Sequence, residues 1–276
     1  MSEPDGAAMP LDLFLVRHGH SEGNRALDAA KKQDLSLMTE EFRRRNASDY
    51  RLTDRGDAQA RAAGRWIREW QARHGVAAFD RLYCSPFVRT RETAGLLGLD
   101  GAQWQLESLL RERDFGLWAG RDRADVARCF PLSSEQKKRD RFLWRPEGGE
   151  NTPDLDMRVR EVLASLAREM AGRRVVCVTH EDVMWAFRYR LEKPTVQKWL
   201  EDHDDDAHDI PNCGILHYTR RTVSGGVADK FARVRLVDPQ APSEAEWIPI
   251  NRPRFTNEQL LAEVEEHYPR LWEASD

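Results

Sequence analysis

The chain has 276 residues, of which 40% are hydrophobic and 33% charged, and its 43 basic and 47 acidic side chains leave a net charge of −4. This length suits one large domain, and the near-balance of charge excludes a nucleic-acid binder that works by bulk attraction. No apolar run approaches the roughly 18 residues needed to cross a bilayer, so no membrane partner is expected.

The cysteines and the N-terminus point to a reducing compartment. Cys84, Cys129, Cys177 and Cys213 form no CxxC pair, which argues against a disulfide framework or a cysteine zinc site. Residues 1–10 carry two acids and no basic segment, unlike a secretory signal. We therefore expect a cytoplasmic protein. The sequence leaves its oligomeric state open, with a homodimer as one possibility.

Hydrophobic runs alternate with amphipathic stretches, a pattern typical of a three-layer α/β/α domain with a mostly parallel central sheet. The predicted strands are Leu13 to Val16, Leu82 to Cys84 and Val175 to Val178. Predicted helices cover Ala58 to Trp70, begin near Val88, include Val159 to Leu166, and run from Val183 to Leu191. In such folds ligands bind at the carboxyl ends of the strands.

Two further segments complete a single domain over residues 1–276, with its core at about 11–215. Residues of about 120–150 are charge-rich and less regular, and they predict a small inserted cap that lies over the sheet. Residues of about 215–276 predict a hairpin and a terminal helix.

The hairpin prediction rests on Ile215 to Val223 and Val227 to Val237, which flank the turn Ser224-Gly225-Gly226. The helix prediction rests on a capping box from Thr256 to Gln259, ahead of the apolar residues Leu260, Leu261, Val264 and Leu271.

Four side chains that suit phosphate chemistry fall at strand ends or at the helix starts just after them: Arg17, His18, Arg89 and His180. Guanidinium groups bind a phosphate dianion bidentately and stay charged at working pH. A neutral imidazole can attack phosphorus, and nearby arginines lower its pKa towards that form. The second imidazole can donate a hydrogen bond to the phosphoryl oxygens in the transition state.

The leaving alkoxide needs a proton, so a carboxylic acid must lie within reach. The polar segment from Leu110 to Gly116 follows an apolar stretch and supplies one. Glu112 is the first candidate for this acid and Asp114 is the spare.

These residues resemble the histidine phosphatase superfamily, which includes the cofactor-dependent phosphoglycerate mutases. The family's Arg-His-Gly after the first strand matches Arg17-His18-Gly19, and its Ser-Pro-x-x-Arg segment matches Ser85 to Arg89. Its Glu-x-x-x-Gly stretch matches Glu112 to Gly116, and its second histidine matches His180. Asn24 matches the asparagine that usually touches the phosphate. The match spans about residues 11 to 200 in the expected order.

The resemblance implies that His18 is the nucleophile and forms a phosphohistidine, while Glu112 is the proton donor. Arg17, Arg89 and His180 would complete the phosphate pocket. Asn24 and Ser21 are further phosphate-binding candidates. Because the arginines and His180 supply positive charge, we expect no metal and no cofactor, and a small phosphorylated compound as substrate.

One neighbour does not fit this pattern easily. After the second histidine the family commonly has glycine, but this chain has Glu181, followed by Asp182. An acid there repels a phosphate unless its side chain points away. Glu181 is thus a candidate for binding a cationic part of the substrate, or simply an acid favoured at a helix start by the helix dipole.

Two departures favour the phosphatase-type branch of the family over a mutase. Phosphoglycerate mutases usually follow the asparagine with a tryptophan-rich segment that closes over a bisphosphate, whereas residues 25–49 of this chain are charged. The segment Phe142 to Glu150 looks more like that of phosphatase-like relatives. A phosphomutase remains the alternative, and a non-catalytic protein that binds a phosphorylated ligand is a more distant one.

Three other features have an ordinary and a functional interpretation. The run His203 to Asp209 is either a solvated acidic loop or a metal site. The basic run Lys137 to Arg139 is either an exposed charged face or a steering element for an anionic substrate. Trp118 and Trp144 are expected in packing or at the entrance of the site.

Overall fold

The computed structural model describes residues 8–205, 208–241, 245–268 and 270–272. A seven-stranded sheet has the order β3-β2-β4-β1-β5-β6-β7. Its parallel half comprises β1 (Asp12–Arg17), β2 (Arg81–Cys84), β3 (Trp104–Leu106) and β4 (Arg174–Thr179). Its antiparallel half adds β5 (Ile215–Thr219), β6 (Arg233–Val237) and β7 (Ile248–Pro249). The predicted α/β fold with mostly parallel central strands is confirmed.

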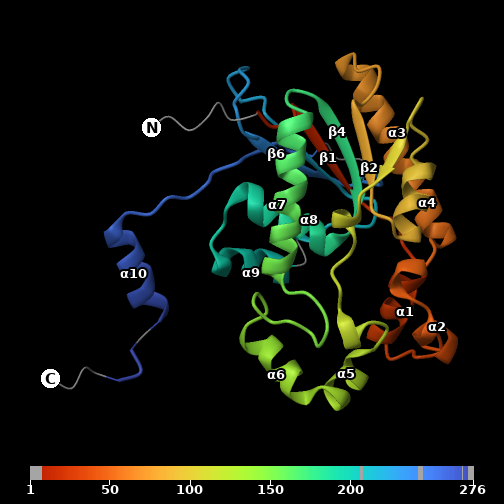
Figure 1. Ribbon diagram of the computed structural model, residues 1–276, viewed down its shortest axis with the longest axis vertical. Helices are drawn as coiled ribbons and strands as arrows, with labels where there is room; N and C mark the ends of the chain where they lie inside the picture. Colours follow the sequence, from red (N-terminus) through yellow and green to blue (C-terminus); the bar gives the residue numbers. More distant parts are fainter. Residues whose placement is uncertain (1–7, 206–207, 242–244, 269, 273–276) are drawn as a thin grey trace.

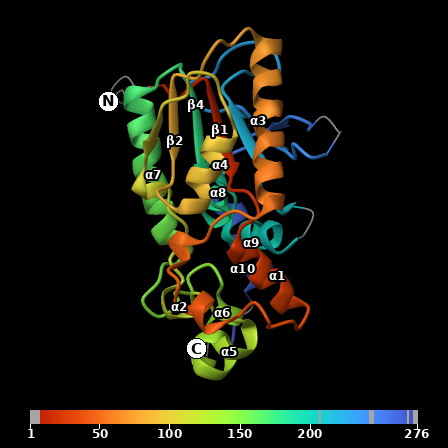
Figure 2. The same cartoon turned by 90° about the vertical axis from the view of Figure 1, so that its right-hand side faces the viewer.

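Helices cover both faces of the sheet (Figures 1 and 2). Strand β1 is buried on both faces, as its unbroken apolar run requires. Leu13 and Leu15 pack in the core beneath α7 (Thr152–Glu169) and α8 (Glu181–Glu192). Phe14 and Val16 pack in the core beneath α3 (Asp54–His74) and, beside it, α4 (Val88–Leu96). The predicted three layers are therefore present.

The inserted cap lies elsewhere than expected. Residues 120–150 contain α5 (Arg123–Cys129) and α6 (Pro131–Arg139), which lie beyond the carboxyl ends of the parallel strands, not over a face of the sheet (Figure 1). Both faces are already covered by α3, α4, α7 and α8, so the insertion packs beyond the ends of the strands. It lies there with α1 (Glu22–Lys31) and α2 (Glu40–Arg44) (Figure 2).

The remaining elements are α9 (Val196–Asp204), α10 (Asn257–His267) and the short 3₁₀ helices η1 (Ala47–Asp49), η2 (Ser108–Leu110) and η3 (Gly116–Trp118). The predicted hairpin forms between β5 and β6, with shorter strands than expected. The Thr256 capping box starts α10 as predicted. This helix ends at His267, so Leu271 lies beyond it.

Within the described residues no helix is long and apolar enough to span a membrane. Most of the N-terminal segment that we compared with a secretory signal, residues 1–7, lies outside the described part of the chain.

The contact between α3 and the end of α4 depends on a missing side chain. A Cβ atom at Gly64 would lie 2.0 Å from the carbonyl oxygen of Leu97. We predict that Gly64→Ala lowers the free energy of unfolding by about 1–3 kcal/mol, because two backbones must move apart. Gly95→Ala, on the open side of α4 with no atom within 4 Å, is the matched control.

The control should stabilise the protein by up to about 1 kcal/mol, since alanine favours a helix interior over glycine. Urea unfolding followed by circular dichroism measures both variants. Equal stability of the two alanine variants would contradict this account of the helix contact.

Candidate functional site

His18 directly follows β1 and is buried at the carboxyl edge of the sheet. Its Nδ1 lies 2.8 Å from the carbonyl oxygen of Gly19. Because a carbonyl only accepts, Nδ1 carries the proton and Nε2 keeps its lone pair. Burial, followed by the positive charges of Arg89 and Arg17, holds the pKa of His18 well below its usual value. His18 is therefore a neutral imidazole with a free nitrogen.

The loop after β1 is fixed by contacts that hold His18 in place. The Gly19 amide donates to Thr93 Oγ1 at 3.0 Å, and Thr93 Oγ1 donates to the Arg89 carbonyl at 2.7 Å. A Cβ atom at Gly19 would lie 2.6 Å from the Gly56 carbonyl oxygen, so this close approach requires glycine. Asn212 Nδ2 donates to the His18 carbonyl at 3.1 Å.

Arg89 and His180 form a hydrogen-bonded pair beside His18. Arg89 Nη2 donates to His180 Nδ1 at 3.1 Å, and its Nη1 donates to the Ala47 carbonyl at 2.7 Å. Since His180 Nδ1 accepts, its Nε2 carries the proton and donates to Ser85 Oγ at 2.8 Å. Burial, then Arg89, lowers the pKa of His180 well below its usual value. In this state His180 orients Arg89.

Arg17 is paired with the acid that the sequence pattern did not accommodate. Arg17 Nη2 lies 2.7 Å from Glu181 Oε2, and Nη1 donates to the Ile210 carbonyl. The buried Nε has no hydrogen-bond partner among the described residues. Burial raises the pKa of Glu181, against the opposing effect of Arg17. Glu181 starts α8 and lines the cavity, so it does not point away from the site.

Ser21 and Asn24 begin α1 with a capping box. Asn24 Oδ1 accepts from the Ser21 amide at 3.1 Å, from Ser21 Oγ at 3.0 Å and from Asn212 Nδ2 at 3.3 Å. The Ser21 hydroxyl is thus used within the cap. The Asn24 side-chain nitrogen has no partner within the described part of the chain, and the residue lines the cavity with a donor to offer.

Glu112 lies opposite these groups, with Oε2 3.7 Å from His180 Nδ1. Burial, then the negative charge of Asp182, raises the pKa of Glu112 to about 8, although Arg89 and Arg17 oppose the shift. Glu112 is therefore protonated at neutral pH. The pKa of Asp182 is lowered, since His203 and Arg113 together outweigh its burial.

The turn at Glu147–Glu150 supports the loop that carries Glu112. Glu150 binds Arg158 through two contacts of 2.9 Å, receives Arg111 at 2.9 Å and accepts from the Asp114 amide at 2.9 Å. A Cβ atom at Gly116 would lie 2.0 Å from the Glu147 carbonyl oxygen. The spare acid, Asp114, is exposed on this loop and accepts from the Gly116 amide at 2.7 Å.

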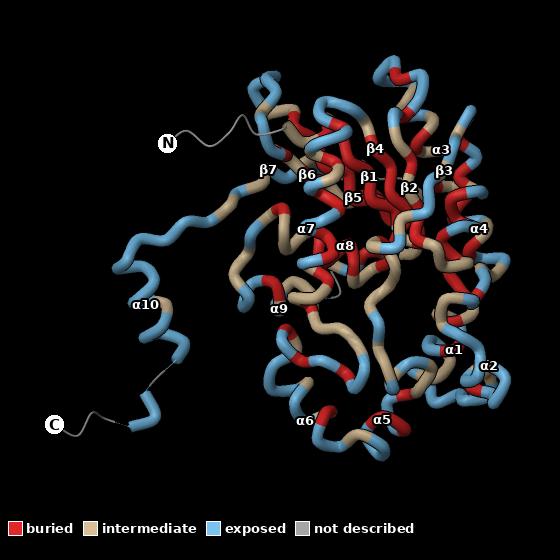
Figure 3. Tube along the Cα trace, in the orientation of Figure 1, coloured by how far each residue is buried: buried red, intermediate tan, exposed pale blue. Residues whose placement is uncertain are grey.

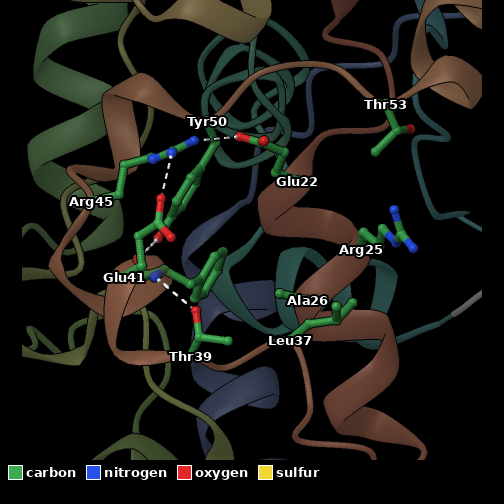
Figure 4. A pocket seen from close by; sticks show the side chains of 10 residues that line it. Glu22, Arg25, Ala26, Leu37, Thr39, Glu41, Arg45, Tyr50 and Thr53 are labelled. Carbon is green, nitrogen blue, oxygen red and sulfur yellow. Dashed lines mark hydrogen bonds and ion pairs between the residues drawn. The ribbon is translucent and has the colours of Figure 1, made fainter.

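A cavity of about 570 Å³ is lined by most of the predicted site residues: Arg17, His18, Ser21, Asn24, Arg89, Glu112 and Glu181. His180, which was expected to complete the phosphate pocket, is not among the lining residues, and its two ring nitrogens contact Arg89 and Ser85. The walls of the cavity also include Arg43, Arg45, Asn46, Ala47 and Tyr50. A smaller cavity of about 260 Å³ shares Arg45 and Tyr50 with it (Figure 4).

Arg45 lies between the two cavities and forms ion pairs with both α1 and α2. Its guanidinium lies 3.2 Å from Glu22 on α1 and 3.3 Å from Glu41 on α2 (Figure 4). The charged segment of residues 25–49 is thus a structural wall of the site.

Trp118 and Trp144 were expected in packing or at the entrance of the site, and they do not line this cavity. The rings of Trp118 and Trp144 pack against each other at 4.5 Å, and the Lys137 ammonium lies 5.5 Å and 4.9 Å from them. This packing inside the cap satisfies both rings. Lys137, the first residue of the basic run Lys137 to Arg139, is therefore partly covered by these two rings.

Within the described residues, one group of three metal-ligand side chains comes together: His18, Glu112 and His180 have donor atoms within 4.8 Å of one another. Arg17 and Arg89 lie beside them, so their charges favour an anion there over a metal ion.

The run His203 to Asp209 is only partly described, because residues 206–207 lie outside the described part. The His203 ring lies 4.9 Å from Trp185 and 4.8 Å from Trp199. His208 lies 3.1 Å from Asp205. His203 Nε2 lies 3.8 Å from Asp182, and Asp204 pairs with Arg141. The metal interpretation stays open.

A family model described as the histidine phosphatase superfamily (branch 1) matches residues 13–208. The chain belongs to the histidine phosphatase superfamily. A 2,3-bisphosphoglycerate-dependent phosphoglycerate mutase of Methylobacterium radiotolerans is 33% identical over 61% of this chain and 73% of its own. The corresponding mutase of Azorhizobium caulinodans is 30% identical over 66% of this chain and 81% of its own.

Solved histidine phosphatase structures share the fold. A mycobacterial glucosyl-3-phosphoglycerate phosphatase has a TM-score of 0.57 at 24% identity, covering 75% of this chain and 90% of its own. A putative alpha-ribazole-5'-P phosphatase from Escherichia coli has a TM-score of 0.56 at 20% identity, covering 90% and 99%. The family thus includes both mutases and phosphatases, and the specific activity is not decided by membership.

The geometry predicts that orthovanadate, a phosphate analogue, binds at Arg89. Arg89→Ala should weaken this binding by about 10- to 100-fold, because charge-assisted hydrogen bonds contribute about 1.5–3 kcal/mol. Isothermal titration calorimetry measures the affinity. Arg91→Ala, an exposed arginine on the same helix, is the control and should bind as the wild type does. Equal loss in both variants would argue against a specific anion site.

Proposed function

We propose that this protein is a phosphatase that hydrolyses a phosphate monoester through a phosphohistidine on His18, with Glu112 as general acid and then general base. The observation that carries the proposal is the pair of protonation states in one cavity. A neutral imidazole with a free Nε2 lies beside a carboxyl group that holds its proton at neutral pH. Such a pair divides the roles of nucleophile and acid.

In the first step His18 Nε2 attacks phosphorus and the bond from phosphorus to the ester oxygen breaks. Glu112 gives its proton to the leaving oxygen, which departs as an alcohol. The guanidinium groups of Arg17 and Arg89, which both line the cavity, stabilise the charge on the phosphoryl oxygens. In the second step Glu112 takes a proton from water, the water oxygen attacks phosphorus, and His18 leaves with inorganic phosphate released.

A phosphomutase is the second candidate, supported by the curated mutases that share 30% and 33% identity with this chain. The charged wall of residues 25–49, with Arg43 and Arg45 on the cavity, favours hydrolysis because it differs from the mutase closing segment. The phosphatase proposal includes a small phosphorylated substrate, no metal, no cofactor and a cytoplasmic location. Free Cys84, Cys129, Cys177 and Cys213 are consistent with that location.

The phosphoenzyme tests the proposal. We expect the wild type to release phosphate from a panel of phosphate esters and, after rapid quench with a ³²P-labelled ester, to carry an acid-labile, base-stable label. His18→Ala should lose both label and turnover, since no other side chain replaces the nucleophile. His208→Ala, an exposed histidine outside the cavity, is the control.

Unchanged phosphate release by His18→Ala would contradict the proposed mechanism. A label that water does not remove, but that an added phosphoglycerate accepts, would instead make the protein a mutase.

The pKa of Glu112, about 8, sets the alkaline limb of the pH profile. Glu112 acts as the acid in its protonated form, so kcat/KM should fall as pH rises through this value. Asp182→Asn removes the negative charge that helps to raise this pKa, so the limb should move to lower pH. Asp114→Asn, on the exposed part of the loop, should leave the limb in place. A limb unchanged in Asp182→Asn would contradict this assignment of the acid.

A further inference from the structure

The C-terminal arm leaves the body of the protein after Arg252. The Arg252 guanidinium donates to the carbonyls of Leu191 at 2.8 Å and Phe231 at 2.9 Å, which anchors the base of the arm. Beyond it, α10 stands apart from the sheet and clear of its own cap (Figures 1 and 3). No residue of α10 is buried. Its capping box shows that the sequence nevertheless specifies a helix there.

One face of α10 is apolar and uncovered. Leu260, Leu261 and Val264 are 47%, 66% and 53% exposed, and their spacing places them on one side of the helix. The same spacing places Glu258 and Glu265 along an edge of this stripe. A free helix of this length is marginal in water, because helices below about 12–15 residues lack the bonds to offset nucleation. We therefore expect this apolar stripe to pack against another surface, which would stabilise the helix.

The cap presents a surface of matching chemistry. Residues 121–145 contain eight lysines and arginines against four acids, whereas α10 contains four glutamates and no lysine or arginine. Leu132 on α6 and Leu143 just after it are 81% and 57% exposed. Lys138 and Arg139 on α6 are also exposed. The cap is thus complementary to α10 in charge and in its exposed leucines, although the two do not touch within one chain (Figure 1).

We propose that α10 of one copy docks on the cap of a second copy, so that two chains exchange their arms and form a two-fold symmetric dimer. Reciprocal exchange uses the same two surfaces twice, as a closed isologous interface requires. Leu260, Leu261 and Val264 pack on Leu132 and Leu143, and the glutamates of α10 lie against the basic residues of the cap. A second copy is the occupant because the complementary surface belongs to this chain, while the arm holds α10 away from its own cap (Figure 1).

Light scattering on the full chain after size exclusion tests the dimer. We expect a mass near twice 31.9 kDa at tens of micromolar, falling on dilution. Val264→Glu places a charge in the stripe and should weaken dimerisation at least about tenfold, ~1.4 kcal/mol. Ala262→Glu adds the same charge on the opposite side of the helix and should leave the dimer intact. A wild type that is monomeric throughout would overturn the proposal.

A charge exchange tests which surfaces meet. Lys138→Glu with Arg139→Glu makes an acidic cap, and Glu258→Lys with Glu265→Lys makes a basic arm. In each double variant alone the arm and the cap carry the same sign of charge, so each should be monomeric. In an equimolar mixture each arm meets a cap of opposite charge on the other variant, so the mixture should dimerise. A mixture that stays monomeric shows that the arm docks on its own chain or elsewhere, and this overturns the proposal.

Discussion

The site depends on keeping two buried groups in their uncharged forms beside two arginines. Burial favours the neutral form of both His18 and Glu112, because each charged form loses its hydration. The arginines lower the pKa of both groups. This favours the neutral form of His18 but opposes the neutral form of Glu112. Asp182 offsets this second effect, since its negative charge raises the pKa of Glu112. Asp182, one of the two acids that follow His180, thus helps to keep Glu112 protonated.

Sheet order explains why these groups meet. Strands β2, β4 and β1 are neighbours, and Arg17 lies opposite Thr179 in the parallel register of β1 and β4. The residues after these strands, Ser85, His180 and His18, therefore come to one edge side by side. The His18 amide donates to the Thr179 carbonyl at 3.0 Å, which extends the ladder one residue into the site. A shift of register by one residue would turn the imidazoles to other faces.

Much of this arrangement could be predicted because it depends on short-range patterns. Strand ends, a proline before α4 and capping boxes are local, so the sequence places Arg17, His18, Arg89 and His180 at element boundaries. The contribution of Asn212 could not be predicted, because it reaches the His18 carbonyl across 194 residues. The support of the acid loop by Glu150 is likewise non-local. The location of the cap depends on the fact that α3, α4, α7 and α8 together cover both faces of the sheet, and no single segment of the chain encodes that.

Glu181 is the residue whose interpretation changes most. A carboxylate on its own would repel a phosphate from the cavity. Here Glu181 Oε2 lies 2.7 Å from Arg17 Nη2, so the positive charge of Arg17 partly offsets its negative charge. Burial already raises the pKa of Glu181. A bound phosphate dianion adds negative charge near the same guanidinium, which raises the pKa of Glu181 further and favours its protonation. The repulsion therefore diminishes as the ligand binds. An acid beside His18 is compatible with anion binding because it is partly buried, paired with Arg17 and able to take up a proton.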